Sequence, residues 1–133
     1  MSEIKIKRKK NTYNPIINIT INTVIGNILF VIFICLSAVI ITKYPVNSEL
    51  LFLFIITSSS LGSLFSGFLS ARKAEKNKLL TGCIASIMLT VIHFIIILCF
   101  NNASLAMKTY IIFPCDIITG IIGTIAGINL IRR

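Results

Sequence analysis

Long unbroken apolar runs dominate the chain, and short polar segments separate them. The runs extend over residues 24–41, 50–70, 79–100 and 110–131. Each is close to the roughly 20 residues that a helix needs to cross a hydrocarbon core about 30 Å thick. The sequence therefore predicts an all-α membrane protein whose four transmembrane helices correspond to these runs.

Helices explain the runs better than strands do. A membrane strand alternates polar and apolar residues over about ten positions, and these runs do not alternate. A helix also satisfies every backbone group within its own segment, as lipid requires. The connections at 42–49, 71–78 and 101–109 are short, so successive helices should be antiparallel neighbours. We expect a basic tail over residues 1–15 and a four-helix domain over residues 16–133.

A weak internal repeat relates the two halves of the chain at a constant offset. Val31 and Ile32 match Val91 and Ile92, and a glycine at position 67 matches one at position 127. One interpretation is two helical hairpins related by an axis along the membrane normal, a known parallel-repeat arrangement. The other is that helices running in the same direction share small residues and a basic end without any repeat. Both interpretations stay open.

The composition supports lipid as the solvent. The 133 residues are 56% hydrophobic and 13% charged, against about 25% charged in a typical soluble domain, and the mean hydropathy is +0.94. The net charge of +9 does not indicate nucleic-acid binding, because the basic residues cluster at the ends of apolar runs and the chain has no Trp. We expect membrane lipids as partners and no nucleic acid.

The basic residues also predict the orientation of the chain. They concentrate in the tail, in the connection 71–78 and at the C-terminus, whereas only Lys43 and Lys108 fall on the other side. Because basic loops are retained in the cytoplasm, we expect both termini to be cytoplasmic. The residues that we expect to face lipid headgroups are Arg72, Lys73, Arg132 and Arg133.

Small residues recur at helical spacing within the last three runs. Residues four positions apart lie on one face of a helix, and small side chains let helices approach closely in lipid. We expect these stripes to pack against other helices of the bundle. Association with a second copy or with another membrane protein is the alternative. The predicted packing residues are Ser59, Gly62, Ser63, Ser66, Gly67, Gly82, Ser86, Thr119, Gly120, Gly123 and Gly127.

One histidine and one acidic residue lie within the runs, His93 in the third and Asp116 in the fourth. A charge at mid-bilayer costs about 2.5–3.5 kcal/mol on insertion scales, so such residues are candidates for function. Their similar distance from the connection 101–109 predicts matched depth and a candidate intramembrane pair. The alternatives are a packed, hydrogen-bonded histidine and an Asp116 in the first turn of a helix that begins near Pro114. Asn27 and Asn129 are further candidates for interhelical hydrogen bonds.

No motif for catalysis, cofactor binding or metal binding is evident. The chain has no H-E-x-x-H, no G-x-S-x-G and no Gly-rich phosphate loop ahead of a helix. The cysteines lack CxxC spacing, and we expect them to be small buried apolar residues: Cys35, Cys83, Cys99 and Cys115. We therefore expect no enzyme, no cofactor and no small-molecule substrate. The expected role is an accessory protein or scaffold, and the alternative is a small transport or permeation subunit that works as an oligomer.

From the second run to the C-terminus, the sequence resembles a known family. The segment LGSLFSGFLSARKAEKNKLLTGCIASIML joins a small-residue helix to a Gly-containing helix through the turn Ser70 to Ala74, and a Gly-rich helix, GIIGTIAGINL, closes the chain. This pattern is similar to the YrzE-type family of small four-helix membrane proteins from Gram-positive bacteria. The resemblance implies the topology and a bacterial plasma membrane. The family has no assigned activity, so the resemblance implies no catalytic residues.

Overall fold

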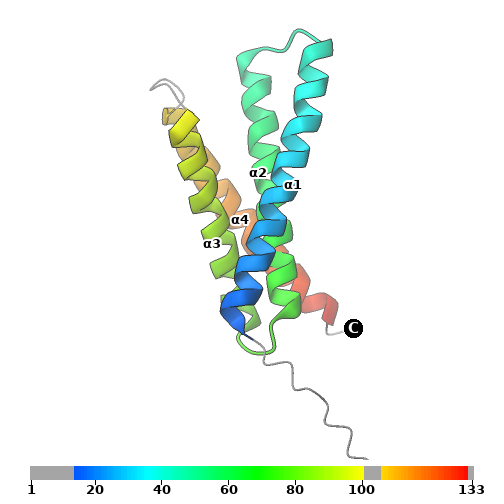
Figure 1. The fold of residues 1–133 in the computed structure, drawn as a ribbon, viewed down its shortest axis with the longest axis vertical. Coiled ribbons are helices and arrows are strands. Elements are labelled where there is room, and N and C mark those ends of the chain that lie inside the picture. Colours follow the sequence, from blue (N-terminus) through cyan, green and yellow to red (C-terminus); the bar gives the residue numbers. More distant parts are fainter. Residues whose placement is uncertain (1–13, 101–105, 132–133) are drawn as a thin grey trace, which may run out of the picture.

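The computed structural model describes residues 14–100 and 106–131, and this part of the chain is built from helices (Figure 1). The helices are α1 (Pro15–Lys43), α2 (Ser48–Lys73), α3 (Lys78–Phe100) and α4 (Ala106–Ile131). All four are long and apolar enough to cross a membrane, which confirms the predicted fold class. Of the predicted tail, residues 1–13 lie outside the described residues.

α1 begins well before its apolar run because its first turn is well specified. The Asn14 side chain accepts a hydrogen bond from the Ile16 N–H at 3.1 Å, and Pro15 occupies the first turn, where its missing N–H is not needed. The helix then continues through the mixed stretch before Val24. It ends at Lys43, and Pro45 follows two residues later, where it cannot continue a helix.

The turn between α2 and α3 depends on one backbone conformation. Asn77 has a φ of 49°, in the left-handed region that Asn tolerates better than most residues. Its carbonyl oxygen accepts hydrogen bonds from the Thr81 N–H at 2.9 Å and from the Thr81 hydroxyl at 3.1 Å. The turn thereby reverses the chain and starts α3 antiparallel to α2.

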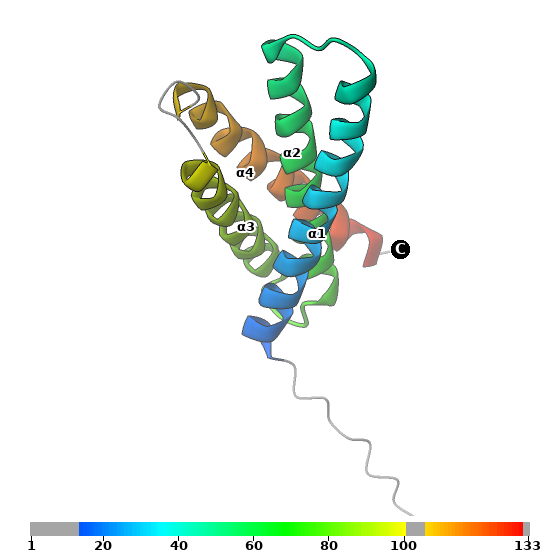
Figure 2. The same ribbon diagram turned by 45° about the horizontal axis from the view of Figure 1, so that its top comes forward.

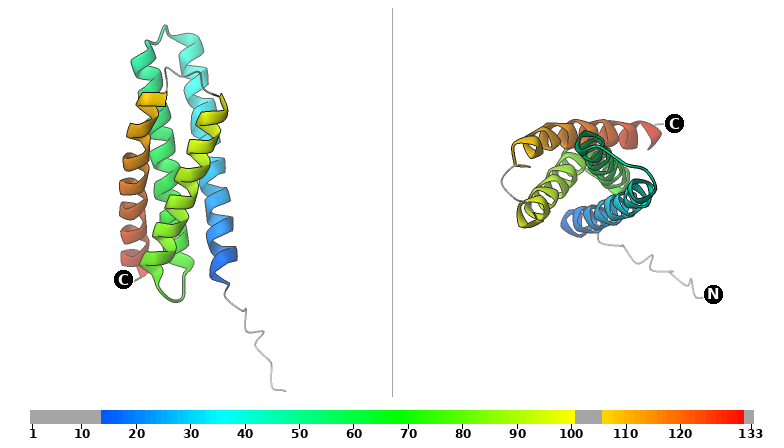
Figure 3. Two further views of the ribbon diagram at one scale, coloured as in Figure 1. Left: turned by 90° about the vertical axis from the view of Figure 1, so that its left-hand side faces the viewer. Right: turned by 90° about the horizontal axis from the view of Figure 1, so that it is seen from above.

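α2 is the centre of the bundle. It packs against α1, α3 and α4, whereas α1 and α4 make no contact with each other across the described ranges, and α2 lies between them when viewed along the bundle (Figure 3). The α1–α2 and α3–α4 hairpins converge at the end that holds residues 74–77 and diverge toward the end that holds residues 44–47 (Figures 1 and 2). We call the first the basal end and the second the distal end.

The interior of the bundle is small and polar, and its exterior is apolar. The buried residues of α2 are serines, glycines and one alanine. Large aliphatic side chains are instead exposed along every helix, with Val31 at 55% and Ile118 at 57% exposure. A soluble protein buries most such side chains, so this surface is suited to lipid.

Glycines bring the backbones of α2 and α4 into direct contact. A Cβ atom on Gly123 would overlap the backbone carbonyl of Leu64, and one on Gly127 would lie 2.5 Å from the carbonyl oxygen of Phe68. Larger residues at these positions would force the helices apart. Among the packing residues predicted from the sequence, the structure buries every one except Thr119, which is half-buried.

Candidate functional site

One cluster of polar side chains is buried between three helices. Ser59 comes from α2 and is 1% exposed, His93 comes from α3 and is 1% exposed, and Asp116 comes from α4 and is 0% exposed. The apolar residues that specify these helices face outward, so the few polar groups turn toward the bundle interior, where they can find partners.

Ser59 joins the other two side chains. Its hydroxyl oxygen lies 2.8 Å from Nδ1 of His93, and its hydroxyl donates a hydrogen bond to Oδ2 of Asp116. Nδ1 of His93 is itself 3.4 Å from the same carboxyl oxygen. The cluster is therefore a histidine–aspartate pair bridged by a serine.

The hydrogen bonds of the cluster restrict where its protons lie. A serine hydroxyl carries one hydrogen. When Ser59 donates it to Asp116, Nδ1 of His93 has to be the donor to the Ser59 oxygen. When Asp116 is protonated, the order reverses, and Ser59 donates to Nδ1. Both orders form a continuous chain of hydrogen bonds, along which a proton can move between the carboxylate and the imidazole.

Further hydroxyl groups of α2 hold Asp116 in place. The Ser63 hydroxyl donates to the main-chain carbonyl of Asp116 at 2.6 Å, and Ser60 Oγ lies 3.4 Å from the second carboxyl oxygen. A buried carboxyl group is costly unless it is hydrogen-bonded. α2 thus supplies the polar groups that let α4 carry an acidic residue inside the bundle.

α1 closes the cluster with an aromatic ring. The ring of Phe30 lies 4.0 Å from the imidazole of His93, centroid to centroid, with 35° between the ring planes. An aromatic face attracts a cation, so this contact suits a charged imidazole as well as a neutral one. Nε2 of His93 is buried and has no hydrogen-bond partner in the part of the chain that the structure describes.

Serine, histidine and aspartate also form the catalytic triad of hydrolases, but the arrangement here differs. In a triad, the aspartate lies at Nδ1 and the serine at Nε2. Here Ser59 and Asp116 both lie at Nδ1 of His93. In addition, the described residues hold no group of three or more His, Cys, Asp or Glu side chains that could bind a metal ion. The geometry is suited to holding and moving a proton.

The structure brings the predicted pair, His93 and Asp116, into contact. The first-turn alternative for Asp116 is wrong, because α4 begins at Ala106 and Pro114 lies inside the helix. Asp116 is therefore about 15 Å along α4 at 1.5 Å per residue. Membrane helices tolerate an internal proline when neighbouring groups satisfy the backbone that it frees.

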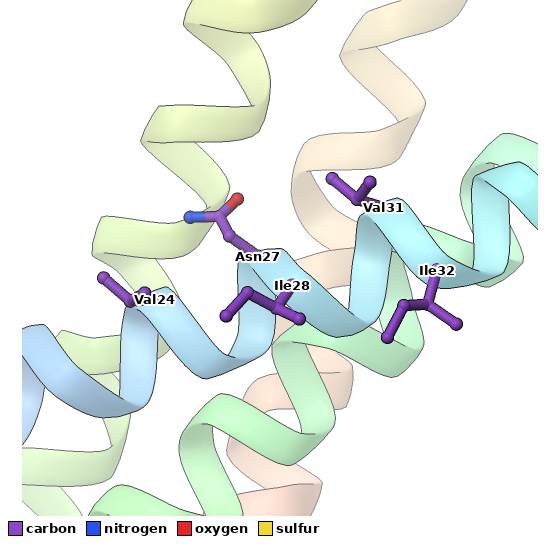
Figure 4. Close-up of a pocket in the computed structure, with 5 residues that line it drawn as sticks. All are labelled: Val24, Asn27, Ile28, Val31 and Ile32. Atoms are coloured by element: carbon purple, nitrogen blue, oxygen red, sulfur yellow. The ribbon is translucent and has the colours of Figure 1, made fainter.

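The other polar candidates have more varied positions. Asn27 is half-buried and Asn129 is exposed, and neither side chain forms a hydrogen bond with any described residue. Asn27 lines an open groove of about 310 Å³ formed by α1 alone (Figure 4), together with Val24, Ile28, Val31 and Ile32. The groove is therefore an open, mainly apolar surface of one helix and has no enclosed binding site.

The remaining predicted residues lie at the surface or outside the described ranges. Arg72 and Lys73 are exposed at the basal end, whereas Arg132 and Arg133 lie outside the described residues. The cysteines have no disulfide partners. The expectation that they are all buried is wrong: Cys35 and Cys99 are exposed, and Cys83 and Cys115 are half-buried, since an apolar thiol can face lipid.

Two features of the polar interior were not predicted. The first is Ser59, which the sequence presents only as a small residue in a packing stripe. The second is a network at the basal end, where Asn22 donates to Asn18 at 2.7 Å and accepts from Nζ of Lys73 at 3.4 Å. One feature of the sequence could have predicted this network: Asn18 and Asn22 are four positions apart near the start of α1, so they lie on one helix face.

Comparison with known proteins identifies a family that matches the chain, but it gives no activity. The family described as a protein of unknown function (DUF3792) matches residues 16–128. The match extends from the first turn of α1 to the last turn of α4, so it includes the whole buried cluster. No curated protein and no solved structure matches the chain.

Proposed function

Because the chain belongs to the DUF3792 family, whose function is unknown, we propose its role from its geometry: a non-enzymatic accessory or scaffold protein that acts through helix–helix or lipid contacts. The resemblance to the YrzE-type family of Gram-positive bacteria supports a bacterial plasma membrane. In this proposal the basal end is cytoplasmic, since Arg72, Lys73 and Lys76 lie there and basic loops are retained inside.

The free surface of α1 carries this proposal. Across the described ranges, α1 packs against α2 and α3 and not against α4. Only 11% of the residues in its most apolar 18-residue stretch are buried, compared with 33–39% in the corresponding stretches of the other helices. Leu36 and Val39 are 55% and 57% exposed on this helix. A helix that is so little buried within its own bundle has a face available for packing against another membrane helix.

Photocrosslinking tests the scaffold role. A photoreactive amino acid replaces Leu36 on α1, and a matched sample carries it at Ile87, which is 49% exposed on α3. In membranes of a Gram-positive host, we expect discrete protein adducts from the α1 position and only lipid adducts from the α3 position. An adduct of twice the chain mass identifies a second copy as the partner. Lipid adducts alone at both positions contradict the scaffold role.

The buried cluster favours a second candidate, a small transport or permeation subunit. Ionisable side chains inside a membrane bundle often belong to ion pathways and proton relays, and Asp116 and His93 are buried together. Proteoliposomes with an internal pH-sensitive dye test this candidate. Proton flux that disappears in Asp116→Asn supports a permeation subunit, and wild-type flux equal to that of protein-free vesicles contradicts it.

A further inference from the structure

Hydroxyl groups line the buried face of α2 from the cluster to the basal end. After Ser59, the residues Ser63, Ser66 and Ser70 follow at intervals of four, three and four positions, so all of them share one helix face. The last three are 0% exposed. From first to last, the series extends about 16 Å along the helix axis at 1.5 Å per residue.

Two of these hydroxyls are buried without a hydrogen bond among the described residues. Ser66 and Ser70, together with Thr23 on the facing helix α1, have no hydrogen-bond partner within the described ranges. Other buried hydroxyls in the bundle, such as those of Ser58 and Thr90, donate to a carbonyl of their own helix, as is common for helical serine and threonine. The Cβ atoms of neighbours on a helix face are about 5–6 Å apart, a separation at which one water molecule can join two hydroxyl groups.

The same faces are apolar on the distal side of the cluster. Ile112 is 4% exposed and lies one turn distal to Asp116 on α4. Phe113 follows it and packs edge-to-face against Phe94 of α3 at 5.2 Å. On α2, the residues one turn distal to Ser59 are isoleucines at positions 55 and 56. On these faces, across the part of the chain that the structure describes, polar groups therefore continue from the cluster toward the basal end and not toward the distal end.

At the basal end, the hydroxyl face meets groups that reach the surface. The carbonyl oxygen of Ser70 accepts a hydrogen bond from Asn18 at 3.3 Å. Asn18 is bonded to Asn22, which accepts from the exposed Lys73. The series of polar groups that begins at the cluster thus ends at the exposed Lys73 of the basal end.

We propose that the Ser59–His93–Asp116 cluster is a proton-binding site and that the buried hydroxyls, bridged by water, give it access to the basal end. Binding adds one H⁺ to the form with a carboxylate and a neutral imidazole. The product is an imidazolium–carboxylate pair or a carboxylic acid beside a neutral imidazole, and both carry no net charge. No electron moves, and this property is independent of the scaffold role.

The side chains that contact the His93–Asp116 pair are uncharged. α1 contributes Phe30, and α2 contributes the hydroxyls of Ser59, Ser60 and Ser63. None of these side chains carries a charge. Within the described contacts of the cluster, the titratable groups are therefore His93 of α3 and Asp116 of α4, and the added proton is held between them.

The chain has one histidine, so ¹⁵N-histidine labelling reports on His93 alone. Solid-state NMR spectra are recorded for the full chain in phosphatidylethanolamine–phosphatidylglycerol bilayers over the pH range in which it stays folded. We expect the ring nitrogens to change protonation or tautomer with pH, and Asp116→Asn to abolish the change. A wild-type spectrum that is constant with pH, or an unaltered titration in Asp116→Asn, overturns the proton-binding site.

Exchange of the His93 ring N–H with water tests the path separately. Ser66→Ala and Ser70→Ala are combined in one variant, and the control is Thr57→Ala, whose exposed hydroxyl bonds the Leu53 carbonyl of its own helix. We expect the double variant to slow exchange at least about tenfold, which corresponds to ~1.4 kcal/mol in the barrier, with the titration retained. Equal rates in the double variant and the control overturn the path and leave the site in place.

Discussion

Nδ1 of His93 lies 3.4 Å from Oδ2 of Asp116, although the two residues are 23 positions apart and belong to different helices. The antiparallel α3–α4 pair brings them to the same depth, and the rotation of each helix turns them toward one another. The contact also includes Ser59 of α2. Three helices are thus joined at one buried point, which gives the cluster a structural effect that stability measurements can detect.

The first prediction concerns the coupling of this pair. Asp116→Asn and His93→Phe should each lower the free energy of unfolding by about 1–3 kcal/mol, because each leaves a buried polar partner unsatisfied. The double variant should lose less than the sum, with a coupling energy of about 0.5–3 kcal/mol. Unfolding in mixed detergent–SDS micelles measures the cycle. Additivity within about 0.5 kcal/mol would show that the contact contributes no pairwise stability.

The second prediction concerns the α2–α4 interface. Leucine at position 123 or 67 should lower stability by about 1–3 kcal/mol or more, because overpacking forces helices apart. A Cβ atom alone on Gly123 already meets the Leu64 carbonyl, and one on Gly67 meets the Gly120 carbonyl. The control is Ala38→Leu at an exposed position of α1. Thermal unfolding in detergent compares them, and equal stability of all variants would contradict a packing role for the glycines.

The third prediction concerns topology. Reporter fusions after Lys76 and at the C-terminus should be active as cytoplasmic reporters, and fusions at Asn47 and Asn102 should be active as external reporters, because basic segments stay in the cytoplasm. Paired alkaline phosphatase and fluorescent-protein fusions measure this in intact cells. An external C-terminus would contradict the proposed orientation and would reverse the side to which the hydroxyl face of α2 leads.

The number and order of the helices could be predicted because lipid leaves few choices for an apolar run of this length. Their ends could not, because they depend on local groups. Asn14 and Pro15 start α1 ahead of its apolar run, and Pro114, which suggests a helix start in isolation, is accommodated inside α4. The first-turn alternative for Asp116 failed with this boundary, since Asp116 lies well inside α4.

The depth of His93 and Asp116 could be predicted, but their orientation about the helix axes could not. Depth follows from residue counting along antiparallel helices, whereas orientation depends on which faces pack. The role of Ser59 was hidden for a related reason. In sequence, a serine in a small-residue stripe has the same pattern as a glycine that permits close approach, and only its neighbours in space show whether its hydroxyl is used.

The last prediction separates these two uses of serine with one chemical change at two positions of α2. Ser59→Ala removes the donor to Asp116 and the partner of His93 Nδ1, so it should lower the free energy of unfolding by about 1–3 kcal/mol. Ser66→Ala removes a buried hydroxyl that has no protein partner among the described residues and that we propose to be bridged by water, so it should cost clearly less than Ser59→Ala, below about 1 kcal/mol. Both variants lose one oxygen atom from one helix face, and the helix propensity change is the same. Unfolding in mixed micelles compares them directly, and a Ser66→Ala loss as large as that of Ser59→Ala would show that the Ser66 hydroxyl is held by a direct hydrogen bond to the protein and not by water.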